Sequence, residues 1–179
     1  MRHLLTPHRG ALCALILSAT VLGVGACTIS PESMVPAEAT AGPERKIPLR
    51  VRVMPVIGAR KTFFGGPAFP TAEKYQEALV LTLVKAGIFA GVSTDAGDVD
   101  LTMTVLSIDQ PPGIAYTVRM VANYTFTSRD GTTLWSETYD SSFSANDIAG
   151  AARTLNANEG AVRENLKALV QGIRERWRP

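Results

Sequence analysis

Alternating apolar and polar side chains predict four β-strands in this chain. Such a period of two is typical of a strand that buries one face of a sheet. Four segments show it: 47–57, 99–105, 116–126 and 134–143. Asp130-Gly131 lies between the last two, and this dipeptide favours the positive φ angles of a tight hairpin. We therefore expect these two strands to be antiparallel neighbours.

Two further segments have the apolar spacing of an amphipathic helix. Thr71 can cap a helix that runs to Ala86, and Gly87 can end it in the left-handed conformation. A longer pattern keeps one apolar face over 148–177, although Gly160 interrupts it. The order strand, helix, three strands, helix (β-α-β-β-β-α) predicts an α+β two-layer sandwich: an antiparallel meander with both helices on one face.

The first 26 residues have the pattern of a secretory leader. Arg2 and Arg9 flank the start of an apolar stretch, which at about 14 residues is too short for a membrane-spanning helix. The stretch ends in Val24-Gly25-Ala26-Cys27, which resembles the lipobox of bacterial lipoproteins. This resemblance implies cleavage before Cys27 and acylation of that cysteine, for example with palmitate. An aspartate directly after the cysteine would resemble the signal that retains lipoproteins in the inner membrane. Thr28 occupies this position here, so the resemblance implies the outer membrane.

These observations divide the chain into three parts. Residues 1–26 are the lipoprotein signal peptide, and residues 27–46 are the lipidated N-terminus with a flexible tether. The tether is proline-rich and lacks aromatic residues, so it has little apolar area to offset the entropy of ordering. Residues 47–179 form a single α+β periplasmic domain, which is within the usual size range.

Removal of the leader changes which chemistry the chain can perform. Arg2 and Arg9 leave, so 16 of the 18 basic residues remain against 16 acidic ones. This balance argues against a nucleic-acid partner, which would call for a basic stripe. His3 and His8 also leave, which excludes histidine-dependent nucleophiles and zinc sites built on cysteine and histidine. We expect no enzyme activity, no metal and no cofactor.

The least ordinary loop is Phe63–Pro70, with the sequence FFGGPAFP. Phe63, Phe64 and Phe69 either fold down to plug one end of the sandwich, or form a contact surface that binds a partner. As a contact surface, the three rings could dock a protein or cover a lipid.

Acidic residues offer weaker candidates. Asp95, Asp98 and Asp100 superficially suggest calcium, but the glycine and distal glutamate of the EF-hand pattern are missing, so a turn is the better interpretation. Glu137, Asp140 and Asp109 could in principle supply a carboxylate pair for glycoside hydrolysis. Glu137 and Asp140 lie an odd number of residues apart on a predicted strand and so face opposite sides, which argues against a pair there.

Three stretches carry a family resemblance: IDQPPG at 108–113, GTTLWSETY at 131–139 and NANEGAVRENL at 156–166. Together they resemble a family of small, uncharacterised proteobacterial outer-membrane lipoproteins, over about 51–173. By architecture alone the chain is also similar to YajG-like and other small α+β envelope lipoproteins. The resemblance implies a lipid-anchored protein on the periplasmic face of the outer membrane and carries no activity.

The leading hypothesis is a non-enzymatic accessory or scaffold lipoprotein that binds an envelope protein in support of assembly or transport. It would use its loop ends or the polar sheet face that carries Arg119, Asn123 and Thr125. The alternative is a periplasmic module that binds a lipid or small ligand between helices and sheet, with Phe63–Pro70 as its lid. A hydrolase that runs on carboxylates alone is a distant third.

Overall fold

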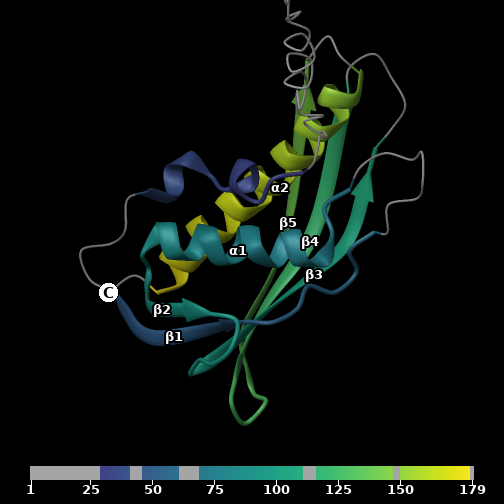
Figure 1. The fold of residues 1–179 in the computed structure, drawn as a ribbon. Helices are drawn as coiled ribbons and strands as arrows, with labels where there is room; N and C mark the ends of the chain where they lie inside the picture. Colours follow the sequence, from purple (N-terminus) through teal and green to yellow (C-terminus); the bar gives the residue numbers. More distant parts are fainter. Residues whose placement is uncertain (1–28, 41–45, 61–68, 111–115, 147–149, 178–179) are drawn as a thin grey trace, which may run out of the picture.

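The computed structural model describes residues 29–40, 46–60, 69–110, 116–146 and 150–177. Within these ranges the chain forms five strands, two α-helices and two short 3₁₀ turns (Figure 1). The strands are β1 (Ile47–Val53), β2 (Phe89–Ser93), β3 (Val99–Asp109), β4 (Tyr116–Ser128) and β5 (Thr133–Ala145). The helices are α1 (Ala72–Ala86) and α2 (Gly150–Arg176), and the turns are η1 (Glu32–Met34) and η2 (Ala37–Thr40).

The strands form one mixed sheet in the order β2-β1-β3-β4-β5. β1 is parallel to both of its neighbours, whereas β3, β4 and β5 form an antiparallel meander. The α+β class and the meander of the last three strands are confirmed. The expectation of a wholly antiparallel sheet is wrong, because α1 carries the chain across the sheet from β1 to β2 and returns it in the same direction.

The expected order of elements also needs a correction, since β2 was not predicted. This strand begins two residues after the glycine that ends α1, and Gly91 lies at its centre. Its five residues pair with β1 alone at the edge of the sheet. A short edge strand with a central glycine shows no clear alternation, so the hydrophobic pattern does not reveal it.

The signals at the ends of α1 act as the sequence predicts. The Thr71 hydroxyl accepts a hydrogen bond from the Lys74 amide at 3.4 Å. Gly87 adopts φ 61°, and its amide donates to the carbonyls of Leu83 and Val84. These bonds satisfy polar groups at both helix ends and fix the length of α1.

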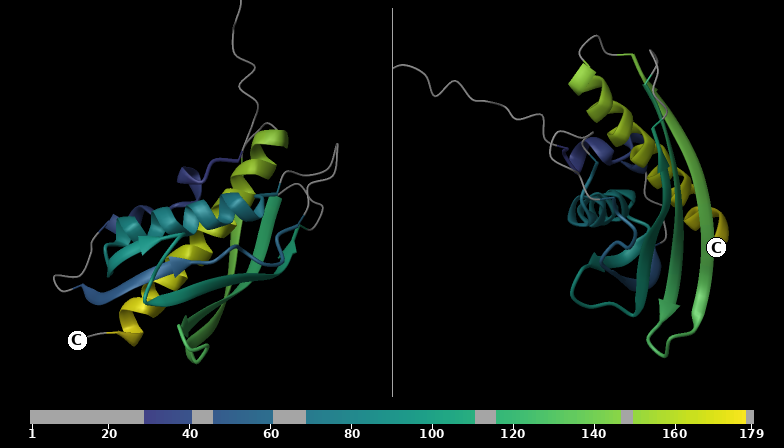
Figure 2. Two further views of the ribbon diagram at one scale, coloured as in Figure 1. Left: turned by 60° about the horizontal axis from the view of Figure 1, so that its bottom comes forward. Right: turned by 90° about the vertical axis from the view of Figure 1, so that its right-hand side faces the viewer.

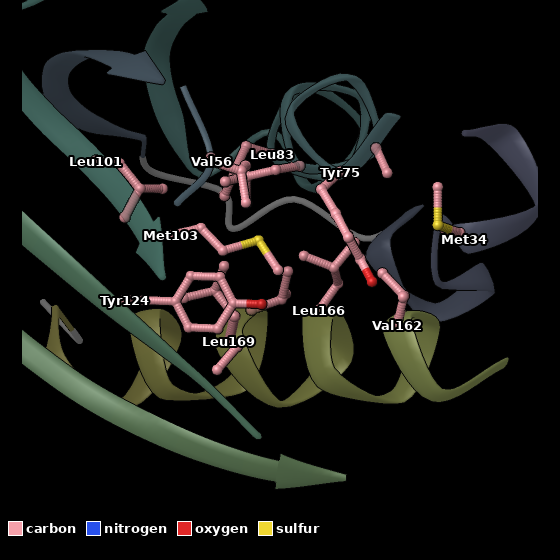
Figure 3. Close-up of a cluster of buried hydrophobic side chains, with 14 of the residues drawn as sticks. Met34, Val56, Tyr75, Leu83, Leu101, Met103, Tyr124, Val162, Leu166 and Leu169 are labelled. Carbon is pink, nitrogen blue, oxygen red and sulfur yellow. The ribbon is translucent and has the colours of Figure 1, made fainter. Parts of the chain in front are cut away.

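Both helices pack on one face of the sheet, and the core lies between the helices and this face (Figure 2). Alternate side chains of β4 point into this core, and each is at most 1% exposed. They are Val118, Met120, Ala122, Tyr124 and Phe126. The close-up shows Tyr124 of β4 beside Met103 of β3, with Leu166 and Leu169 of α2 packed against them (Figure 3).

Residues 29–40, here called the strap, pack along α2 and beside α1. Its two turns, η1 and η2, contact both α1 and α2, and neither turn contacts a strand. Met34 is 0% exposed and Ala39 1% exposed. The expectation of a flexible tether over 27–46 is therefore corrected for this part: the apolar side chains of Met34 and Ala39 are buried, and each belongs to one of the two 3₁₀ turns that order the strap.

Candidate functional site

The sheet face that turns away from the helices is polar, and we call its part on β4 and β5 the open face. Register places the outward side chains of the two strands opposite one another. The open face consists of Thr117, Arg119, Val121, Asn123, Thr125, Ser136, Thr138, Asp140, Ser142 and Ser144. The β5 members are exposed, and most of the β4 members are half-buried. The polar sheet face expected from the sequence is therefore present.

Hydrogen bonds between strands order the hydroxyl and amide groups of the open face. The Asn123 side-chain amide donates to the Ser136 hydroxyl at 3.2 Å and to the Thr138 hydroxyl at 3.1 Å. Thr117 and Ser144 share a bond of 2.8 Å. Because these groups already have partners in fixed positions, the open face is a preorganised polar surface.

Charges on the outward side of the sheet are arranged as pairs. Arg119 forms an ion pair with Asp140, which lowers the pKa of the Asp140 carboxyl mainly through their hydrogen bonds. On the neighbouring strands the Arg52 guanidinium lies 2.6 Å from an Asp100 oxygen and holds the pKa of that carboxyl below its usual value. Each positive charge thus faces a negative one, so neither pair adds net charge to this surface.

β5 occupies one end of the sheet. Within the described residues it pairs with β4 only, over a length of 13 residues. The backbone amides and carbonyls along its other edge can therefore pair with an added strand.

Buried polar bonds fix β4 and β5 to α2. The Tyr124 hydroxyl donates to Asn165 Oδ1 at 2.8 Å, and Asn165 Nδ2 donates to the Tyr139 carbonyl at 3.1 Å and to the Ser141 hydroxyl at 3.0 Å. Asn165 is 0% exposed. This residue joins both strands to the helix, so the open face rests on a rigid support. Sequence reasoning missed Asn165, although a polar residue within an apolar helix stripe is a usable signal.

Gly160 allows α2 to approach β5 closely. A Cβ at this position would overlap the ring of Phe143. The glycine that interrupts the helical pattern is therefore required for packing between helix and sheet. The same ring lies 5.3 Å from the Arg163 guanidinium carbon, which covers it from the helix side.

The sequence-based candidate residues lie in different places. Phe69 is 8% exposed and belongs to the core, with the Arg60 guanidinium carbon 5.5 Å from its ring centre. For this residue the plug interpretation fits better than a contact surface. Cys27, Phe63 and Phe64 lie outside the described residues.

The acidic candidates serve local structure. The Asp98 carboxylate accepts a hydrogen bond from the Arg50 amide at 2.9 Å, and Asp95 lies in a turn closed by the Ser93 hydroxyl. Glu137 pairs with an inward residue of β4 and Asp140 with an outward one, so they face opposite sides as predicted. The described part of the chain contains no group of three metal-binding side chains.

None of the described helices has the length and apolar character needed to cross a bilayer.

Comparison with known proteins shows similarity in fold only. No protein-family model and no curated protein matches the chain. A Xanthomonas campestris protein designated DUF330 has a TM-score of 0.60 at 17% identity, over 75% of this chain and 89% of that chain. A Chlamydia trachomatis protein has a TM-score of 0.50 at 10% identity, over 73% and 95%.

Weaker similarities include proteins named as lipoproteins. One is a Neisseria meningitidis lipoprotein with a TM-score of 0.43 at 16% identity, over 72% of this chain and 99% of that chain. A similarity of this size carries no argument about fold or function. The stronger matches show a shared α+β fold, and function has to be argued from the residues.

Proposed function

We propose that this chain is a lipid-anchored accessory protein of the bacterial envelope that uses its open face to bind another envelope protein. The proposed anchor is an acylated Cys27, at the outer membrane and on its periplasmic side. The lipobox-like Val24-Gly25-Ala26-Cys27 supports the anchor, and Thr28 supports the outer membrane. Several acyl chains on one residue hold a protein to a bilayer effectively permanently.

The open face is the observation that carries the binding proposal. It presents hydroxyls, amides and the Arg119–Asp140 pair on two strands of 13 residues each. These groups have partners within the sheet, but the exposed hydroxyl and carboxylate oxygens can accept further hydrogen bonds from a partner protein, directly or through water, as in polar interfaces. A partner that adds a strand along the edge of β5 would gain backbone hydrogen bonds as well.

A lipid or small-ligand site between helices and sheet is the second candidate. Such a site needs an apolar cavity of roughly 300–1,000 Å³. Fully buried side chains occupy the region between the helices and the sheet, among them Tyr75, Leu83, Tyr124 and Leu166 (Figure 3). This packing favours the accessory protein over the ligand-binding module.

Absence of an enzyme activity is part of the proposal. After residue 27 the sequence contains neither histidine nor cysteine, so nucleophiles that depend on them cannot form. The carboxylates of Asp100 and Asp140 are engaged by arginines, and their lowered pKa values make them poor general acids at neutral pH.

Site-specific photocrosslinking in intact cells tests the proposal. A photoreactive residue is placed at Ser136 or Ser142, which are exposed on the open face, and at the exposed Gln171 of α2 as a control. We expect one defined envelope protein to be captured from Ser136 and Ser142 and not from Gln171. Capture of lipid alone, or equal capture from all three positions, would contradict the proposal.

A further inference from the structure

The strap is bound to α2 at three points along its length. The Ser30 amide donates to Glu159 Oε1 at 2.9 Å, at the start of the strap. Arg163 Nη1 donates to the Ser33 carbonyl at 2.6 Å, in its middle. Lys167 Nζ pairs with Glu38 Oε1 at 3.0 Å, near its end. Because Glu159, Arg163 and Lys167 succeed one another at helical spacing, the strap runs parallel to α2.

α1 also contacts the strap. Lys85 Nζ donates to the Pro36 carbonyl at 3.3 Å, and Met34 and Ala39 are buried within the core cluster. Ile29, the first described residue, also packs against this cluster. The strap is therefore packed against the rest of the domain from Ile29, at its start, to Ala39, near its end.

Cys27 precedes Ile29 by only two peptide links. Two extended residues span about 7 Å. A flexible tether of about 19 residues would instead leave the domain roughly 25 Å from its anchor on average, free to rotate. If acyl chains fix Cys27 to a bilayer, that bilayer lies beside the point where the strap begins.

That point and the open face are on opposite sides of the molecule. The strap lies beside α1 and packs against α2 on the side away from the sheet, α2 covers the inner face of β4 and β5, and the open face is the outer face of these two strands (Figure 2). Helix layers and sheets pack about 10 Å apart. The strap and the open face are therefore separated by about two layers, or roughly 20 Å.

We propose that the strap faces the lipid surface and holds the domain in one orientation, with the open face turned away from the bilayer. This inference rests on the proposed lipid anchor at Cys27. It gives the strap a specific role: because the strap is packed from Ile29 onward, only two peptide links separate Cys27 from the packed part of the domain. The open face then points toward the compartment in which a protein partner would approach.

Fluorescence quenching by a headgroup-labelled lipid tests the orientation. The full-length chain is expressed in bacteria, and its acylated form is purified from membranes and reconstituted in phosphatidylethanolamine–phosphatidylglycerol vesicles that contain a nitroxide headgroup lipid. A single added cysteine carries the fluorophore, either Ala37→Cys on the strap or Ser142→Cys on the open face; both positions are exposed. We expect quenching several-fold stronger at position 37, since nitroxides act over short range. Equal quenching, or stronger quenching at position 142, would overturn the proposal.

An insertion provides the matched control. A flexible glycine-serine segment of about 20 residues between Thr28 and Ile29 lengthens the connection by roughly 25 Å without altering the strap or the helices. Quenching at position 37 should then fall to the level at position 142. If the insertion leaves quenching at position 37 unchanged, the short connection does not set the orientation and the inference is wrong.

Mass spectrometry of the same preparation separates the two proposals. An unmodified Cys27 overturns the proposed anchor and, with it, this inference. An acylated Cys27 together with equal quenching at both positions overturns the inference alone.

Discussion

The buried Tyr124 hydroxyl connects the sheet that carries the open face to α2, so its removal tests whether this connection stabilises the domain. It donates to Asn165 Oδ1 at 2.8 Å, and both residues are 0% exposed. Tyr124→Phe removes this donor and leaves the ring in place. The substitution therefore leaves the buried side-chain carbonyl oxygen of Asn165 without this donor, and creates almost no cavity.

The cost follows from this geometry. A net hydrogen bond contributes about 0.5–1.5 kcal/mol, and a buried acceptor left unpaired costs about 1–3 kcal/mol. We expect the free energy of unfolding to fall by about 1–3 kcal/mol for Tyr124→Phe. For a domain of this size each kcal/mol lowers Tm by about 2–4 °C.

Tyr75 provides the matched control. Its hydroxyl is also buried but has no hydrogen-bond partner among the described residues. Burial raises the pKa of Tyr75, so the group stays a neutral hydroxyl that forgoes its water contacts. Tyr75→Phe removes that penalty, and we expect unfolding free energy to stay level or rise by up to about 1 kcal/mol.

Urea unfolding followed by tryptophan fluorescence measures both variants. Trp135 and Trp177 lie 5.9 Å apart between ring centres and report on the contact between β5 and the end of α2. Equal losses in the two variants, or a larger loss for Tyr75→Phe, would refute the reasoning that the Tyr124–Asn165 bond joins sheet to helix.

Two further predictions concern packing and pH. Gly160→Ala should destabilise the domain by about 1–3 kcal/mol, because the new Cβ overlaps the Phe143 ring, whereas Gly150→Ala has open space and should change little; equal urea midpoints for the two variants would contradict this. Asp100 has a folded-state pKa below its unfolded value because of Arg52, so its contribution is present above about pH 4 and is lost as pH falls through the folded pKa. Urea midpoints measured from pH 7 to pH 3 should therefore fall less steeply for Asp100→Asn than for the parent chain, and parallel profiles would count against this ion pair.

Much of the fold could be predicted because local patterns and tertiary contacts agree. α1 has its cap and stop residues in place, and β4 keeps strict alternation along its length. The hairpin between β4 and β5 turns at Gly131, which adopts φ 88°. In these elements the residues that set local geometry are also those that bury the apolar face.

Other features depend on contacts distant in sequence. The parallel pairing of β1 with β3 depends on β2, because the chain runs along one side of β1 as β2 and then continues in the same direction along the other side as β3. β2 is too short to show a clear hydrophobic alternation. The strap is ordered by Glu159, Arg163 and Lys167, more than a hundred residues away. Composition alone indicates a tether, because the segment contains few apolar residues. Composition does not show that the helices provide sites in which these few residues are buried.

The candidate site was predicted in part. The polar sheet face follows from alternation, since the inward positions of β4 fix which side chains point outward. Phe69 was proposed as a possible contact residue on composition, but it is buried beneath Arg60. The sequence does not show whether an aromatic side chain in a loop is buried, because burial depends on the space that the packed helices and strands leave for it.

Intact-mass analysis of the protein purified from bacterial membranes tests the central claim most directly. The account predicts a mature chain that begins at Cys27 and carries acyl chains on that residue. A chain that retains its first 26 residues, or one with an unmodified Cys27 thiol, would contradict the anchored accessory protein and the orientation inferred from its strap.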